Sequence, residues 1–188
     1  TAASAALFRS PVLRDKARPR AVFAPCFRTP RRAIMKTEAA RSGRVLNPST
    51  KGSVTMIAIG CDHAGIDLKP HVIAVLEELG LPYRDFGTFS HDSVDYPVYG
   101  ELAARAVASG ECELGIVLCG TGQGIGMTAN KVHGVRCCIC SEPYSAQMGR
   151  QHNDANMLAI GARVVGTELA KMIVRTFLTC SFQGGRHQ

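Results

Sequence analysis

From Met56 onward, short apolar runs alternate with segments whose apolar residues recur at helical spacing. The expected strands are residues 56–60, 82–87, 114–118, 135–140 and 157–160; the expected helices are residues 66–79, 98–109, 121–132, 143–151 and 167–178. Every connection is short, which favours right-handed crossovers between parallel strands. The sequence therefore predicts an α/β fold of three layers, with a five-stranded parallel sheet between helices.

The first 55 residues follow a different pattern. They hold twelve of the 22 Lys and Arg residues but only two of the 15 Asp and Glu residues, so they carry a charge of +10 while residues 56–188 carry −3. Five prolines interrupt any helix, and the composition cannot bury enough apolar surface to offset the entropy lost on ordering. We therefore expect a disordered basic N-terminal arm, followed by one domain over residues 56–188.

This arm also has the composition of a targeting signal. It is rich in Arg and Ser and poor in acid, which is typical of an organelle transit peptide. Its Ser, Thr and Ala content favours the plastid over the mitochondrion. The alternative is a basic tail that binds anionic surfaces non-specifically, in which case the protein would stay in the cytosol.

The composition also argues against other classes of protein. The predicted domain is mildly acidic, which argues against a nucleic-acid partner, and no apolar run reaches the roughly 18 residues that a membrane span needs. Seven of the eight cysteines fall in or beside apolar runs, and only Cys26 lies in the arm. Reduced thiols are therefore expected rather than a secreted disulfide framework.

Polar residues follow the predicted strands, where parallel sheets bind ligands. Asp62 and His63 follow the first strand, and Cys119 begins a glycine-rich loop after the third. The helix after the fourth strand ends in His152 and Asn153. Two histidines that are each flanked by a carboxylate or amide are candidates for proton transfer, and we expect both near one pocket.

The glycine-rich loop is the most informative segment. Gly120, Gly122, Gly124 and Gly126 alternate with larger residues, so backbone N–H groups can converge on a phosphate or on an oxyanion formed during reaction. A dinucleotide loop is less favoured, because the loop follows the third strand, lacks GxGxxG and has no acidic residue at the end of the next strand. It is not a P-loop either, because no Gly-Lys-Ser/Thr follows.

The cysteines divide by position. At the end of a buried strand and facing several amides, Cys119 should have a useful thiolate fraction. Cys61, Cys112 and Cys180 are interpreted as small core residues. Cys137, Cys138 and Cys140 are interpreted as buried strand thiols rather than metal ligands, because alternation along a strand separates neighbouring side chains.

The remaining basic residues of the domain are less informative. His71, His91 and His133 are expected on the surface. Arg186 and His187, after Gly184 and Gly185, form either an unstructured tail or a phosphate clamp.

Taken together, these motifs resemble the type B ribose-5-phosphate isomerases, a family that includes allose-6-phosphate and galactose-6-phosphate isomerases. The resemblance covers essentially all of residues 56–188, and the motifs are Gly60-Cys-Asp-His-Ala-Gly65, Asp95-Tyr-Pro97, Cys119-Gly-Thr-Gly-Gln-Gly124, Ala129-Asn-Lys131, Ser141-Glu-Pro-Tyr-Ser-Ala146 and Arg150-Gln-His-Asn-Asp-Ala-Asn156. It implies a Rossmann-like domain that interconverts ribose 5-phosphate and ribulose 5-phosphate, a step of the pentose phosphate pathway and Calvin cycle. It also implies that no metal or other cofactor is used and that a homodimer or tetramer shares its pockets between subunits.

The resemblance assigns roles residue by residue. Cys119 is the expected base, His152 assists ring opening with Thr121 as its candidate helper, and Asp62 holds the sugar hydroxyls. The amides of Gly120, Gly122 and Gly124 resemble the hole for the enediolate. The expected substrate contacts are Tyr96 and Asn153, and the phosphate-side residues are His63, Arg163 and Arg186.

Two comparisons with the family pattern qualify this assignment. Ile125 together with Cys119 matches the branch that uses a cysteine base. The family usually has a further Arg beyond the Arg-His motif, whereas this sequence ends at Gln188, so either fewer cations bind the phosphate or the sequence is truncated. Three alternatives stay open: a non-catalytic sugar-phosphate-binding module, an isomerase preferring a hexose 6-phosphate, and a nucleic-acid binder that uses the basic arm.

Overall fold

The computed structural model of the chain describes residues 55–188. The arm over residues 1–54, with Cys26 and the targeting prediction, lies outside the described residues. The strands are β1 (Ile57–Cys61), β2 (Tyr83–Asp85), β3 (Leu114–Cys119), β4 (Cys137–Ile139) and β5 (Met157–Gly161). The helices are α1 (Lys69–Glu78), α2 (Tyr96–Ala108), α3 (Gln123–Ala129), α4 (Pro143–Asn153), α5 (Thr167–Thr179) and the 3₁₀ turn η1 (Gly185–His187).

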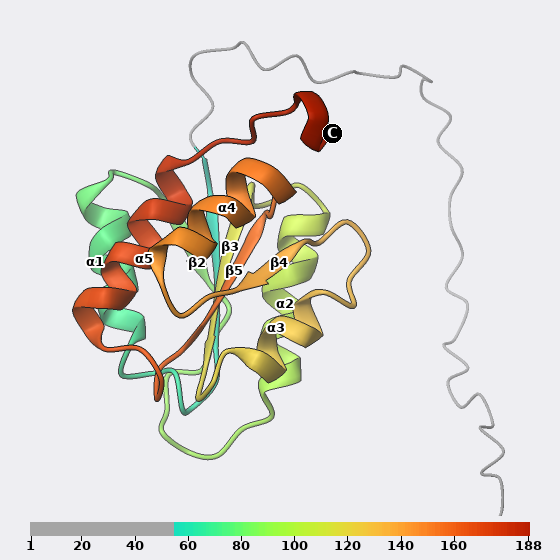
Figure 1. The fold of residues 1–188 in the computed structure, drawn as a ribbon. Helices are drawn as coiled ribbons and strands as arrows, with labels where there is room; N and C mark the ends of the chain where they lie inside the picture. The colour runs from blue at the N-terminus through green and yellow to red at the C-terminus, as the bar shows by residue number, and fades with distance from the viewer. Residues whose placement is uncertain (1–54) are drawn as a thin grey trace, which may run out of the picture. The chain divides into compact units, whose positions relative to one another are not determined.

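The five strands form one parallel sheet in the order β2-β1-β3-β5-β4. Helices α1, α4 and α5 cover one face, and α2 and α3 cover the other (Figure 1). The predicted α/β, Rossmann-like three-layer fold with a five-stranded parallel sheet is confirmed. No helix within residues 55–188 is long and apolar enough to cross a membrane.

Each face of the sheet has its own apolar core. Strand side chains alternate between the two faces, so Ile116 and Leu118 of β3 pack toward α1 and α5, whereas Val117 and Cys119 pack toward α2 and α3. The central strands β1, β3 and β5 are buried along their whole length, as expected for strands covered on both sides. Because these strands consist of near-continuous apolar runs, they could be predicted from the sequence.

Most elements differ from the predicted ranges by one to three residues at one or both ends, and three of these differences are informative. Helix α1 begins at Lys69 rather than at residue 66, because the Asp62 carboxylate accepts the N–H groups of Ala64 and Gly65 and holds a preceding turn. Helix α2 begins two residues early, at Tyr96, because Pro97 suits the first turn of a helix. Strand β4 lies at the sheet edge and pairs over three residues only.

Candidate active site

The carboxyl ends of β1 and β3 lie side by side at the point where the chain changes direction across the sheet. Cys61 of β1 is in register with Leu118 of β3, and Asp62 N–H donates to the Leu118 carbonyl at 3.2 Å. This register brings Asp62 beside Cys119. In parallel sheets, such a switch point is where ligands bind.

Asp62 is a buried carboxylate held by backbone donors. Only 4% of the residue is exposed, and its Oδ1 accepts the N–H groups of Ala64 at 2.9 Å and Gly65 at 3.0 Å. The other carboxylate oxygen makes no hydrogen bond within residues 55–188. Asp62 can therefore keep its position while that oxygen accepts a hydroxyl from a ligand.

The Cys119 sulfur faces the glycine-rich loop. Its Sγ accepts the backbone N–H of Gly122 at 3.1 Å, and the residue is 5% exposed. The expectation that Cys119 turns toward the loop is thus met. A donor N–H beside the sulfur stabilises negative charge there.

The loop itself needs glycine at defined points. Gly122 has φ +76°, and a Cβ there would lie 2.9 Å from the Ile160 carbonyl carbon. Across the loop, a Cβ on Gly161 would lie 2.5 Å from the backbone of Thr121. The backbone of β5 and the loop therefore touch directly. The N–H groups of Gly124 and Ile125, in the first turn of α3, have no acceptor within the helix.

Tyr96 closes one side of the loop. Its ring packs on Gly124, where an added Cβ would lie 2.7 Å from Cζ and 3.0 Å from the hydroxyl oxygen. The ring is partly exposed, at 39%. This position supports the prediction that Tyr96 is a ligand contact.

Beside this centre lies a cleft of about 500 Å³ that contains His63 and Arg163. The Arg163 side chain passes over Gly120, and its backbone N–H donates to the Gly120 carbonyl at 2.9 Å. The first residues of α5 also line the cleft. The lining also includes Asp67, whose carboxylate lies 3.7 Å from His91 Nε2. With that carboxylate facing His91, the arginine, His63 and the helix N-terminus together favour an anion.

The orientation of His63 is set by the chain itself. Its Nδ1 accepts the backbone N–H of Val94 at 3.1 Å. In the neutral ring the proton is then on Nε2, which serves as a hydrogen-bond donor.

Gly166 and Thr167, which begin α5, were not among the predicted site residues, although they line the cleft. They could have been predicted, because an amphipathic helix follows the last strand and its first residues must lie at the carboxyl end of the sheet.

The twelve predicted site residues fall into two groups. Nine lie around the carboxyl ends of the strands: Asp62, His63, Tyr96, Cys119, Gly120, Thr121, Gly122, Gly124 and Arg163. The other three, His152, Asn153 and Arg186, lie at the opposite edge of the sheet, where the C-terminus also lies (Figure 1). Along the five-residue strand β5, the end of the sheet where the strands begin lies roughly 13 Å from the end where they finish. Within one chain His152 therefore lies away from the strand-end pocket, because a helix after a parallel strand returns to the other edge. A pocket shared between subunits, as the family resemblance implies, would instead take His152 and Asn153 from a neighbouring copy.

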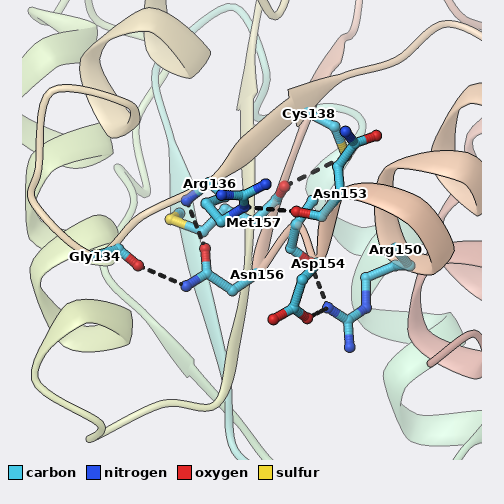
Figure 2. A network of polar contacts seen from close by, with 9 residues as sticks. Gly134, Arg136, Cys138, Arg150, Asn153, Asp154, Asn156 and Met157 are labelled. Atoms are coloured by element: carbon cyan, nitrogen blue, oxygen red, sulfur yellow. Dashed lines mark hydrogen bonds and ion pairs between the residues drawn. The ribbon is translucent and has the colours of Figure 1, made fainter. Parts of the chain in front are cut away.

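A polar network fixes the end of α4, as Figure 2 shows. Arg136 Nε donates to the Asn153 carbonyl at 2.5 Å, and Arg150 Nη1 donates to the Ala155 carbonyl at 2.6 Å and lies 3.3 Å from Asp154 Oδ1. Asn156 bridges the start of β4, accepting from Arg136 N–H at 2.8 Å and donating to the Gly134 carbonyl at 2.9 Å. These bonds hold His152 and Asn153 in place.

The C-terminal segment packs on α4. His187 stacks on His152 with ring centroids 4.1 Å apart, and Gln183 N–H donates to the Gln151 carbonyl at 3.0 Å. Desolvation, followed by the charges of His152 and Arg186, lowers the pKa of His187. The C-terminal segment is therefore ordered and is not an unstructured tail. It places Arg186 and His187 next to His152.

The other cysteines differ in burial. Cys140 is buried as predicted, but Cys137 and Cys138 are only half-buried, because β4 is the outermost strand of the sheet. Burial raises the pKa of the Cys61 and Cys137 thiols to about 12. Cys112 is buried as predicted, but Cys180 is only half-buried because the chain leaves α5 there. No cluster of three or more metal-binding side chains occurs within the described domain.

Comparison with known proteins gives one consistent family. The family described as Ribose/Galactose Isomerase matches residues 57–188. Ribose-5-phosphate isomerase B of Escherichia coli K12 is 56% identical over 132 residues, which cover 70% of this chain and 89% of the relative. A structure of Clostridium thermocellum ribose-5-phosphate isomerase B is 53% identical, with a TM-score of 0.69 over 71% of this chain and 90% of that chain. The Mycoplasma genitalium isomerase B, solved with bound ribulose 5-phosphate, is 38% identical with a TM-score of 0.69, over 71% of this chain and 90% of that one.

The glycine geometry predicts losses of stability of different size for two similar substitutions. Gly122→Ala forces a positive φ on alanine against rigid backbone and should lower the free energy of unfolding by about 1–3 kcal/mol. Gly124→Ala meets only the movable ring of Tyr96 and should leave stability within about 1 kcal/mol while displacing that ring. Urea unfolding of both variants measures this, and equal losses of stability would contradict the described loop.

Proposed function

The chain belongs to the ribose/galactose isomerase family and is an isomerase, and we propose that it interconverts ribose 5-phosphate and ribulose 5-phosphate through an enediolate. The observation that carries this proposal is the Cys119 sulfur, which accepts the Gly122 N–H of the glycine-rich loop and lies at a strand end next to the one that Asp62 follows. A base, a carboxylate for hydroxyl protons and an anion hole are what this proton transfer needs. The relatives named for this reaction support the choice of substrate.

The proposed chemistry moves one proton between neighbouring carbons. The Cys119 thiolate removes the proton from C2 of the open-chain aldose, and the electron pair forms the C1–C2 double bond while O1 becomes an oxyanion. The N–H groups of the loop stabilise this oxyanion. The Cys119 thiol exchanges its proton with solvent while the enediolate is bound and then gives a proton to C1. The proton of the C2 hydroxyl passes to O1, with Asp62 holding both oxygens. The product is the ketose, and no co-reactant is consumed.

The cleft beside Gly120 would hold the phosphate. Arg163 supplies a positive charge, His63 supplies an Nε2–H donor, and the first N–H groups of α5 face the same space. Binding energy from this remote group can position C1 and C2 against the sulfur. In this proposal the phosphate binds in the cleft with His63 and Arg163, apart from the loop amides that stabilise the enediolate oxygen.

We also propose that the pocket is completed by a second copy of the chain. His152, Asn153 and Arg186 lie together on one surface, at the sheet edge opposite to Cys119, so they cannot act on a sugar held by their own chain. A neighbouring subunit could bring them to it. In this arrangement His152 and Thr121 assist ring opening, Asn153 contacts the substrate and Arg186 adds a phosphate contact.

For the arm, we propose that residues 1–55 direct the enzyme to an organelle, with the plastid favoured over the mitochondrion. The composition of the arm supports this, and a mature N-terminus near residue 50 would be the expected product of processing.

Direct assay separates the isomerase from its alternatives. We expect turnover of ribose 5-phosphate, slower turnover of allose 6-phosphate, and no loss of rate with a chelator, because the proposed chemistry uses only side chains and amides. A coupled assay of ribulose formation measures this. Binding of ribose 5-phosphate without turnover would favour the non-catalytic module, and faster turnover of allose 6-phosphate would favour the hexose alternative.

Subunit complementation tests the shared pocket. Cys119→Ala and His152→Ala should each be inactive, but a refolded equimolar mixture should regain about one quarter of wild-type activity. Half of its dimers would be mixed, and each mixed dimer would have one intact site. No recovery in a mixture shown to contain mixed dimers would place both residues in sites of a single chain.

A further inference from the structure

A buried lysine begins α1, close to the candidate site but outside the set of residues that the chemistry uses. Lys69 is 5% exposed, and its Nζ lies 2.8 Å from Asp85 Oδ2 and donates to the Thr88 carbonyl at 2.7 Å. The ring of Phe89 covers the ammonium, with its centroid 4.1 Å from Nζ. The charge is therefore enclosed on several sides by one connection of the chain.

The position is unfavourable for lysine by local rules. A positive charge in the first turn of a helix opposes the helix dipole, and a buried ammonium loses its hydration. Both costs are offset by the Asp85 carboxylate, the Thr88 carbonyl and the face of the Phe89 ring. Neither cost would arise with an apolar residue at this site. We therefore look for the role of Lys69 in the residues that it binds, Asp85 and Thr88.

Lys69 holds the connection between β2 and α2, residues 86–95. Asp85 precedes this loop, and its Oδ1 accepts the Gly87 N–H at 2.8 Å while Oδ2 pairs with Lys69. The Thr88 N–H donates to the Cys61 carbonyl at 2.9 Å, next to Asp62. The first residues of the loop are thus tied to both α1 and the end of β1.

The far end of the same loop contacts the candidate site. Val94 N–H donates to Nδ1 of His63 at 3.1 Å, and the loop then leads into Tyr96, which packs on Gly124. The loop is therefore anchored near its start, where Thr88 binds Lys69, and contacts the candidate site near its end, where Val94 binds His63. Between them its residues are largely exposed. The further contacts there are bonds among Thr88, Ser90 and Asp92 and an exposed pair of His91 with Asp67 at 3.7 Å.

We propose that Lys69 is a positioning residue: by anchoring the loop of residues 86–95, it keeps the Val94 N–H on Nδ1 of His63 and so keeps the Nε2–H of His63 directed at the phosphate of the substrate. This inference rests on the proposed function only for the identity of that anion. It assigns to Lys69 no contact with substrate.

The first test compares Lys69→Met with the double variant Lys69→Met/Asp85→Asn. The single variant leaves a buried carboxylate without its cation, so it should unfold at a lower urea concentration than wild type. The double variant removes that lone charge, while the Asn oxygen still accepts the Gly87 N–H, so stability should largely return. The KM for ribose 5-phosphate should stay raised about tenfold in both variants, as for loss of one well-oriented hydrogen bond, with kcat within about twofold. A wild-type KM in the double variant would overturn the proposal.

The second test asks whether Lys69 acts through His63. In a His63→Gln background, Lys69→Met should change KM by less than about twofold, because the group that it positions is already absent. A full tenfold effect in that background would mean that Lys69 acts elsewhere. Lys171→Met, which removes a lysine from the exposed pair with Glu168, is the matched control and should behave as wild type.

A binding measurement keeps this inference separate from the proposed function. Titration with inorganic phosphate should show weaker binding by Lys69→Met/Asp85→Asn than by wild type, by about tenfold, whether or not the protein turns over sugar. Absence of turnover by wild type would contradict the proposed isomerase alone. Equal phosphate binding by wild type and the double variant would contradict the role of Lys69.

Discussion

The parallel register of β1 and β3 is the constraint on which the candidate site depends. It places Cys61 opposite Leu118, so the residues that follow the two strands, Asp62 and the loop from Cys119, leave the sheet side by side. Apolar side chains covered on both faces of the sheet fix this register, because a slip of one residue would turn every strand side chain to the other face. The chemistry at the edge of the sheet is therefore set by packing in its middle.

Close backbone contact is the second requirement. The loop after β3 lies directly against β5, at Gly122 and Gly161, with no room for a side chain at either point. In the conformation that results, the Gly122 N–H donates to the Cys119 sulfur at 3.1 Å. The glycines thus have two effects, since they permit the loop conformation and place a backbone N–H on the sulfur.

Much of this could be predicted from the sequence, for identifiable reasons. The central strands are buried on both faces and therefore appear as unbroken apolar runs, and the carboxyl ends of parallel strands share one edge, so Asp62 and Cys119 could be placed together. The place of His152 within its own chain was missed because this residue lies at the end of the helix that follows β4, and that helix runs back to the end of the sheet where the strands begin. Lys69 gave only a faint signal, a cation in the first turn of a helix, and its burial depends on a loop whose path sequence patterns do not give.

Proton transfer by the Cys119 sulfur is the step on which the proposed function rests, and exchange with solvent measures that step most directly. In D₂O, the wild-type protein should introduce deuterium at the carbons between which the proton moves. The variant Cys119→Ala should lose this exchange by a factor of about 10²–10⁴ while unfolding at the same urea concentration as wild type. A folded Cys119→Ala variant that exchanges at the wild-type rate would contradict the account.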